Sequence, residues 1–151
     1  IMIGGSDEMK QKYLPDVASG ATFAAFGLTE ANAGSDASGL QTTAVEDRDE
    51  WVLNGTKQWI TNGGEAQIYT VVAMTDKSRG PRGASIFVVE EGDPGFSCGL
   101  KEKKMGIRTS STTELIFKDC RIHADRIVGR NGTGFITVMN TLDSSRPGIA
   151  D

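Results

Sequence analysis

Over most of its length the chain shows a strand-like pattern of short apolar runs, separated by glycine, proline, asparagine and aspartate. The Asn54-Gly55 pair is the strongest hairpin signal, because these two residues suit the tight turn between antiparallel strands. Repeated short strands with turn residues between them predict an all-β sandwich or barrel. We expect its strands at residues 23–28, 40–46, 51–53, 56–60, 68–75, 84–90, 96–100 and 114–122.

The two ends of the chain have the spacing of helices instead. Residues 6–17 place Met9 and Tyr13 four positions apart on one face, with Ser6 in position to cap the first turn. Pro15 should kink or end this helix. Near the other end, four apolar residues repeat at the spacing of one helix face. They are Phe135, Val138, Met139 and Leu142.

Composition narrows the class of protein. The 151 residues suit one ordinary domain, and the 19 glycines are nearly twice the usual share of about 7%, which favours turns and short strands. With 16 basic against 20 acidic residues the net charge is −4, so the chain lacks the basic surface of a nucleic-acid module. No apolar stretch reaches the ~20 residues of a membrane span, and no signal peptide is visible.

Some short motifs match known sites only in part. Cys98 and Cys120 form no CxxC pair and His123 is the single histidine, so we expect two buried free thiols, with a Cys98–Cys120 disulfide as the alternative, and no metal site. The sequence Gly132-Thr133-Gly134 lacks the third glycine of a dinucleotide-binding fingerprint. None of these motifs predicts chemistry by itself.

A serine hydrolase is the sharpest rival hypothesis. Residues 95–99 match the G-x-S-x-G nucleophile elbow, and Asp119 and His123 follow in the usual order. An elbow, however, needs a strand that runs straight into the serine and a helix that follows at once. Residues 90–94 interrupt the approach and residues 100–106 indicate a strand end and a loop, so the surrounding sequence argues against a hydrolase.

Two segments, residues 26–36 and residues 57–64, each combine small hydroxyl residues, glycines and an aromatic side chain. Exposed backbone N–H groups and threonine hydroxyls could hold a polar heterocycle or a pyrophosphate, and the indole of Trp59 could cover a flat ring. The same residues also suit ordinary turns around a tryptophan of the core. From the residues alone, both interpretations stay open.

The same segments resemble the motifs of a known enzyme family. Residues 26–36 resemble the Leu-Thr-Glu-Pro-x-Ala-Gly-Ser-Asp signature of the acyl-CoA dehydrogenases, although Ala31-Asn32 stand where Pro-Gly is usual. Residues 59–63 are similar to the family's Trp-Ile-Thr-Asn-Gly motif. Two later blocks, residues 104–121 and residues 142–150, also follow the family pattern in order.

This resemblance implies a fragment of an α–β–α three-domain flavoenzyme, mainly β, with a small antiparallel β-barrel or sandwich and short terminal helices. Residues 1–21 would end the N-terminal helical domain, residues 22–129 would form the middle β-barrel, and residues 130–151 would start the C-terminal helical domain.

The resemblance also implies FAD as the cofactor. In the family, the position of Thr29 bonds the polar edge of the flavin, that of Trp59 packs on the isoalloxazine, and that of Thr61 bonds N5. Ser35 would lie near the pyrophosphate and the thioester, and Asp143 and Arg146 would touch the acyl-CoA. The implied flavin-contacting residues are Phe26, Leu28, Thr29, Gly34, Ser35, Trp59, Ile60 and Thr61.

The implied reaction is α,β-desaturation of an acyl-CoA thioester in fatty acid metabolism, with electrons passed to an electron-transfer flavoprotein. The catalytic base is expected outside these residues, since Ser145 stands where some members carry a glutamate, so the fragment alone should be inactive. The resemblance further implies a homotetrameric parent in the bacterial cytoplasm or the mitochondrial matrix. The alternatives are an acyl-CoA oxidase or related flavin oxidase on the same scaffold, or, for the isolated chain, a non-catalytic β binding module.

Overall fold

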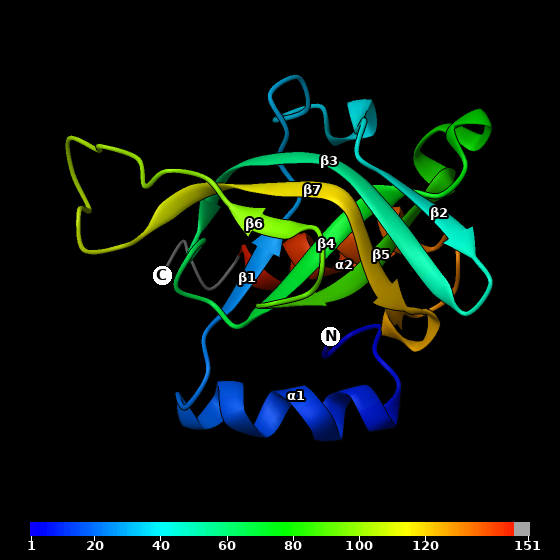
Figure 1. Ribbon diagram of the computed structural model, residues 1–151, viewed down its shortest axis with the longest axis horizontal. Coiled ribbons are helices and arrows are strands. Elements are labelled where there is room, and N and C mark those ends of the chain that lie inside the picture. Colours follow the sequence, from blue (N-terminus) through cyan, green and yellow to red (C-terminus); the bar gives the residue numbers. More distant parts are fainter. Residues whose placement is uncertain (147–151) are drawn as a thin grey trace.

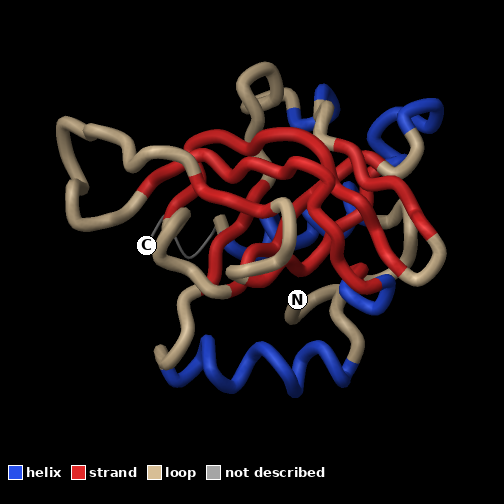
Figure 2. The backbone as a smooth tube through the Cα atoms, viewed as in Figure 1, coloured by secondary structure: helices blue, strands red, loops and turns tan. Residues whose placement is uncertain are grey.

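The centre of the structure is one sheet, which confirms the mainly β class that the sequence predicts (Figures 1 and 2). The computed structural model describes residues 1–146, so the part of the C-terminal motif at residues 147–150 lies outside the described residues. Within this range eight strands pair in the order β6-β7-β3-β2-β4-β5-β8, and β1 pairs with β4. Their bounds are β1 Ala24–Gly27, β2 Thr43–Asp47, β3 Glu50–Thr61, β4 Ile68–Met74, β5 Ala84–Glu90, β6 Phe96–Cys98, β7 Thr112–His123 and β8 Ile127–Val128.

Most neighbouring strands are antiparallel, as expected, while β1 and β2 each run parallel to β4. The short 3-10 turns η1 (Ala37–Gly39), η2 (Lys77–Gly83) and η3 (Ala124–Arg126) lie in the connections between strands. The long antiparallel pair of β3 and β7 forms the upper layer in Figure 1, with β4 and β5 beneath it.

The predicted hairpin at Asn54-Gly55 is wrong, because both residues lie inside the continuous strand β3. Gly55 has a φ of +143°, and a Cβ there would stand 2.6 Å from the Thr42 hydroxyl oxygen, so the glycine allows a close approach between backbones. The pairing of β3 with β7 shifts register at this point, as at a β-bulge. The reversal between β2 and β3 lies at Arg48, which has a φ of +62°, in the charged segment between the strands predicted at residues 40–46 and 51–53.

Two hydrophobic clusters use opposite faces of the central strands. Along β4, Tyr69 and Val71 belong to the cluster enclosed by the curved sheet, and Ile68 and Val72 belong to the cluster under the helices. Side chains alternate between the faces of a strand, so a strand that serves both clusters is apolar at nearly every position, with Thr70 in β4 and Ser85 in β5 as exceptions. This explains why the strands predicted at residues 68–75 and 84–90 agree closely with β4 and β5.

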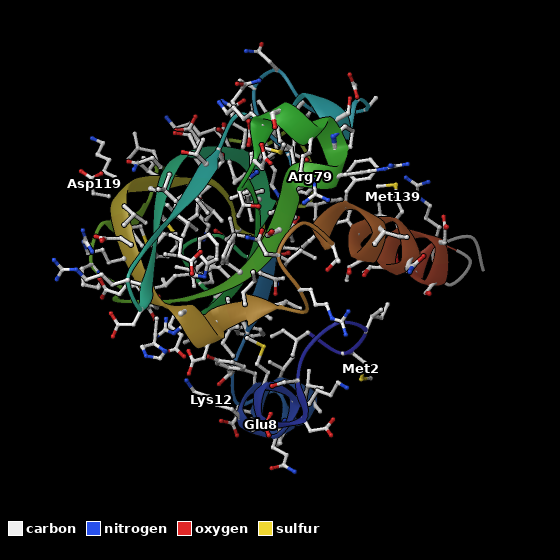
Figure 3. The ribbon with its side chains drawn as sticks, turned by 90° about the vertical axis from the view of Figure 1, so that its right-hand side faces the viewer. Met2, Glu8, Lys12, Arg79, Asp119 and Met139 are labelled. Carbon is white, nitrogen blue, oxygen red and sulfur yellow. The ribbon has the colours of Figure 1, made fainter. Side chains whose placement is uncertain are left out.

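Helix α1 (Asp7–Ser19) lies below the sheet in Figures 1 and 3. Its start is as predicted, because the Met9 amide donates to the Ser6 hydroxyl at 3.2 Å. Pro15 does not end the helix, which runs on until Gly20 adopts a φ of +79° and closes it. The buried Met9 and the buried Tyr13 form its contact face, as their spacing predicted.

Helix α2 (Gly134–Ser145) lies against the sheet on the face behind it in Figure 1. Its predicted apolar face is confirmed, with Val138 fully buried and Phe135, Met139 and Leu142 packed at the edge of the same cluster. A Cβ at Gly134 would stand 2.7 Å from the Ser85 backbone, so glycine lets the helix begin directly on β5. Neither α-helix of residues 1–146 has the length and apolarity that a membrane crossing requires.

Candidate functional site

The two segments that the sequence singles out meet at one side of the sheet. The loop of residues 28–42 rises above β3 at the top of Figure 1 and is hydrogen-bonded to the strand beneath it. The Gln58 amide donates to the Thr29 carbonyl at 2.8 Å, and the Lys57 ammonium donates to the Leu28 carbonyl at 3.2 Å. Thr29 is therefore hydrogen-bonded directly to Gln58, the residue that precedes Trp59.

Trp59 is presented to solvent by a second irregularity in β3. The register against β7 shifts between Lys57 and Ile60, both of which are buried, so Gln58 and Trp59 both face outward. Trp59 has a φ of +59°, which is rare for a bulky residue, and its side chain is 60% exposed. The core-tryptophan interpretation of Trp59 is thus wrong. The core contains Trp51, which packs against Phe87 with ring centroids 5.2 Å apart.

The end of β3 beyond the tryptophan is fixed from both sides. The Thr61 side chain is exposed next to the bulge, whereas Ile60 belongs to the core. The Asn62 side-chain amide donates to the Ala24 carbonyl at 3.2 Å on β1. On the other side, the buried Ser111 hydroxyl donates to the Gly63 carbonyl at 2.7 Å. These bonds fix the segment that follows β3, and thereby the end of the strand that carries Trp59 and Thr61.

The loop between β1 and β2 contains a tight turn at Glu30–Ala33. Glu30 and Ala33 exchange two backbone hydrogen bonds of 3.1 Å, and the buried side chain of Ala33 anchors the turn. Gly34 and Ser35 follow on the exposed outer side, where a Cβ at Gly34 would meet nothing within 4 Å. The Asp36 carboxylate then caps η1 through the Ser38 amide at 3.0 Å. The loop therefore has an open face beside β3.

A buried ion pair, which no sequence motif indicated, joins the loop of residues 28–42 to β3. Lys57 Nζ lies 2.7 Å from Glu30 Oε1, with the lysine side chain 0% and the glutamate side chain 7% exposed. The Glu30 carboxylate also accepts the Thr42 amide at 3.0 Å and the Gln41 amide at 2.7 Å. One signal was available: Lys57 has the same parity along β3 as the buried Trp51 and Leu53, so strand alternation places it in the core.

The surroundings of Glu30 favour its charged form. Burial acts to raise its pKa, but hydrogen bonds from Lys57 and Thr42 and the charge of Lys57 hold the pKa of Glu30 below its ordinary value. Burial lowers the pKa of Lys57, and the pair with Glu30 opposes that change. A carboxylate that accepts two backbone amides and one ammonium is a satisfied buried charge.

Acid is expected to destabilise the fold through Glu30 and Glu90. Burial acts to raise the pKa of Glu90 as well, yet Lys12, Tyr13 and Arg126 hold it below its ordinary value of 4.5. A carboxyl whose pKa is lower in the folded state stabilises the fold above its unfolded pKa, and that contribution is lost as the pH falls through its folded pKa. Urea unfolding should show a constant midpoint from about pH 7 to pH 5 and a falling one below that.

The control for this experiment is Glu90→Gln, which leaves the buried pair intact and removes one of the two carboxyls. Its midpoint should fall less steeply in acid than that of the wild type. A midpoint that is unchanged down to pH 3 in the wild type would contradict the assignment of both groups.

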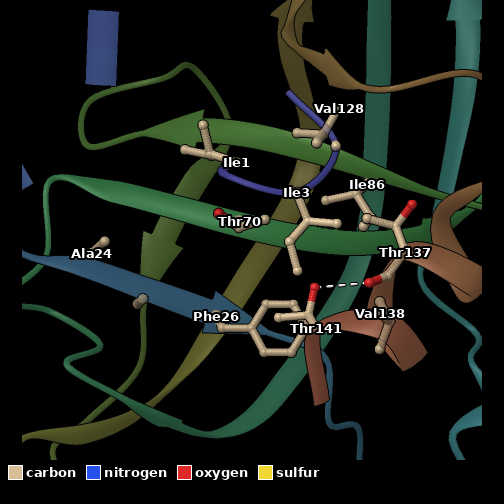
Figure 4. A pocket seen from close by; sticks show the side chains of 12 residues that line it. Ile1, Ile3, Ala24, Phe26, Thr70, Ile86, Val128, Thr137, Val138 and Thr141 are labelled. Atoms are coloured by element: carbon tan, nitrogen blue, oxygen red, sulfur yellow. Dashed lines mark hydrogen bonds between the residues drawn. The ribbon is translucent and has the colours of Figure 1, made fainter. Parts of the chain in front are cut away.

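Phe26 faces a different part of the molecule from Trp59. With Thr141 and Val138 of α2, its ring lines a cavity of about 290 Å³ between β1, β5, α2 and the N-terminal segment (Figure 4). Asp143 lies farther along α2 and Arg146 directly follows the helix, and both are exposed. In residues 1–146 the structure shows no hydrogen bond or ion pair between them and the loop that carries Ser35, so it does not bring the expected substrate residues together.

The nucleophile-elbow motif is part of a sheet edge. Ser97 lies in the middle of the short strand β6, which pairs with β7, and no helix follows it. His123 ends β7 and interacts with Asp125 at 2.9 Å. The strand–serine–helix geometry that a hydrolase requires is absent from residues 95–106.

Comparison with known proteins places these motifs in context. Residues 25–120 match the family model of the acyl-CoA dehydrogenase middle domain. The probable acyl-CoA dehydrogenase fadE25 of Mycobacterium leprae is 51% identical over 149 residues, which are 99% of this chain and 38% of that protein.

Solved structures agree with the sequence comparison. Butyryl-CoA dehydrogenase from Megasphaera elsdenii superposes with a TM-score of 0.92 at 51% identity, over 96% of this chain and 38% of that one. A chain in the structure of the electron transferring flavoprotein of Acidaminococcus fermentans superposes with a TM-score of 0.96 at 53% identity, over 99% of this chain and 40% of that one. The present chain thus spans 38% to 40% of the length of these three proteins.

Proposed function

Because this chain belongs to the acyl-CoA dehydrogenase family, whose middle domain it matches, we propose that it is the flavin-facing domain of an FAD-dependent enzyme that desaturates acyl-CoA thioesters between Cα and Cβ. The observation that carries the proposal is the exposed indole of Trp59, whose backbone has a positive φ and whose preceding residue, Gln58, is hydrogen-bonded to Thr29. A large aromatic side chain that the fold turns away from its core suits a flat ligand.

The residues present fit an isoalloxazine and its ribityl pyrophosphate tail. Trp59 would cover the ring, while the exposed Thr61 hydroxyl and the Thr29 side chain would bond its polar atoms. The exposed residues Gly34 and Ser35 would face the pyrophosphate, since a Cβ at Gly34 would meet nothing within 4 Å. The backbones of Phe26, Leu28 and Ile60 complete the proposed contact set.

A bound FAD would supply the acceptor for the hydride that leaves the substrate Cβ. This chain would orient the flavin and the substrate. Ser35 would lie at the thioester of the acyl-CoA, and Asp143 in α2 and Arg146 directly after it would bind the CoA portion. The base that removes the α-proton would come from outside these residues, since Ser145 is neutral and cannot serve.

The proposal extends to the whole protein. Residues 1–21, 22–129 and 130–151 would be the end, the whole and the start of three successive domains. The whole protein would be a tetramer in the cytoplasm or the mitochondrial matrix and would pass its electrons to an electron-transfer flavoprotein. The superposition of this chain on a chain in the structure of an electron transferring flavoprotein supports that partnership.

The test uses the full-length protein. Purified enzyme should show the absorbance of bound flavin, and addition of an acyl-CoA without oxygen should bleach it and yield the 2-enoyl-CoA. No bleaching with short-, medium-, long- and branched-chain acyl-CoA would refute the proposal. Release of hydrogen peroxide in air at the rate of turnover would identify an oxidase on the same scaffold instead.

Replacing Trp59 by alanine should weaken FAD binding to the full-length apoprotein by about tenfold or more, because the stacked indole is lost. The thermal unfolding temperature of the apoprotein should hardly change, since the side chain is mostly exposed. Val45→Ala is a matched control, as Val45 is 61% exposed on β2 and lies outside the site. Equal FAD affinities for the two variants would contradict the role of Trp59.

A further inference from the structure

The Glu30–Lys57 pair costs more to bury than ordinary core residues would. Removing two charges from water is expensive, and apolar residues of similar volume often stabilise a protein as well or better. Stability is therefore a weak reason for the pair. A fixed geometry is a stronger one, because a buried charged pair with satisfied donors tolerates few alternative arrangements.

The contacts of the pair show what geometry it fixes. Glu30 accepts the backbone amides of Gln41 and Thr42, so its carboxylate joins the two ends of the loop that carries Gly34 and Ser35. Lys57 donates to the Leu28 carbonyl, which directly precedes Thr29. One ion pair thus closes the loop and attaches it to β3.

Lys57 is also the last regular residue before the bulge of β3. The register with β7 breaks directly after it, and the next amide, that of Gln58, is the one that donates to Thr29. The Gln58 side chain continues outward to the Glu114 carboxylate at 3.0 Å. The direction of the Trp59 indole therefore depends on a bulge that is anchored on one side by the buried ammonium.

We propose that the Glu30–Lys57 ion pair is a positioning device, which sets the location of Thr29 relative to Trp59 and thereby the affinity of the site for FAD. Neither residue touches the ligand; both act through the loop and the bulge. This inference rests on the proposed function. It also makes a prediction about the apoprotein alone, namely that the hydrogen bond from Gln58 to Thr29 weakens when the pair is removed.

The experiment compares two double variants of the full-length protein. Glu30→Gln/Lys57→Met removes both charges together and retains side chains of similar size, so that no unpaired buried charge remains. Arg126→Met/Asp93→Asn is the control, because it removes the largely buried Arg126–Asp93 pair beyond the end of β5, together with the contact of Arg126 with Glu90. Hydrogen exchange of the Gln58 amide in the apoprotein, FAD binding and thermal unfolding are measured for each.

The pair variant should exchange the Gln58 amide faster and bind FAD about tenfold or more weakly, even at a temperature at which it is fully folded. The control variant should lose thermal stability and leave both other quantities unchanged within about twofold. If the pair variant does not fold, Glu30→Asp, which retains the charge and shortens its reach, is measured in its place and should give the same direction of change.

Wild-type exchange at Gln58 together with wild-type FAD affinity, in a folded variant of the pair, would overturn the inference. Equal losses of FAD affinity in the pair variant and the control would overturn it too, because they would indicate a merely structural role. A wild-type protein that binds no FAD would refute the proposed function instead, and the exchange of the Gln58 amide would still test the positioning role.

Discussion

Replacing Lys57 alone by methionine is expected to destabilise the protein by about 3–5 kcal/mol. Methionine fills a similar volume, so the loss would arise from charge and not from a cavity. The Glu30 carboxylate, only 7% exposed, would retain the amides of Gln41 and Thr42 but lose its single ammonium partner. Urea unfolding at neutral pH measures the change in the free energy of unfolding.

The control for this prediction is Lys101→Met. Lys101 pairs with Glu65 at 3.0 Å, but both side chains are more than half exposed, so its loss should cost under about 1 kcal/mol. An equally small effect at Lys57 would mean that Glu30 reaches solvent or takes up a proton in the variant. Raising the pH would distinguish these outcomes, because it penalises a protonated carboxyl and leaves a solvated one unaffected.

Replacing Gly95 by alanine is expected to destabilise the protein by about 2–5 kcal/mol, through backbone strain and a steric clash together. Gly95 has a φ of +82°, and a Cβ there would stand 2.3 Å from the Lys118 carbonyl oxygen and 2.9 Å from the Cys120 Cα. These are backbone atoms of β7, which cannot move without breaking the pairing of β6. Thermal and urea unfolding should both show the loss.

Gly92→Ala separates the two causes. Gly92 has a similar φ of +94°, but a Cβ there meets nothing within 4 Å, so the variant should cost only the strain of about 1–2 kcal/mol. A Gly95 variant no less stable than the Gly92 variant would show that β7 yields easily. The expected difference would assign the first glycine of the G-x-S-x-G motif to strand packing.

The sequence predicted the fold best where a strand is buried on both sides. Residues 68–75 and 84–90 are apolar at every position that the two clusters need, and their boundaries agree with β4 and β5 to within one residue. The hairpin prediction at Asn54-Gly55 failed because the dipeptide lies inside β3, opposite a register shift at which β7 carries the extra residue. What requires a glycine at this point is Thr42, which is distant in sequence but lies against Gly55 in the fold.

The candidate site, too, could be predicted where a local motif marks it and not where it depends on contacts between distant residues. The motifs located the loop around Thr29 and the segment around Trp59, and the structure brings these two segments together. Alternation along β3 would place both Lys57 and Trp59 inside, and only the register shift after Lys57 turns the indole outward. The pairing of Lys57 with Glu30 was equally hidden, because it depends on the path of a loop and not on local pattern.

The contrast between the two tryptophans gives the molecule two optical reporters of its own. Trp51 is 6% exposed in the core and Trp59 is 60% exposed at the bulge. Iodide should therefore quench the emission of Trp59 and spare that of Trp51, and a Trp51→Phe variant isolates the outer signal. Energy transfer from that single indole to a bound flavin would then follow ligand binding in real time, while Trp51 emission in a Trp59→Phe variant would follow unfolding of the sheet.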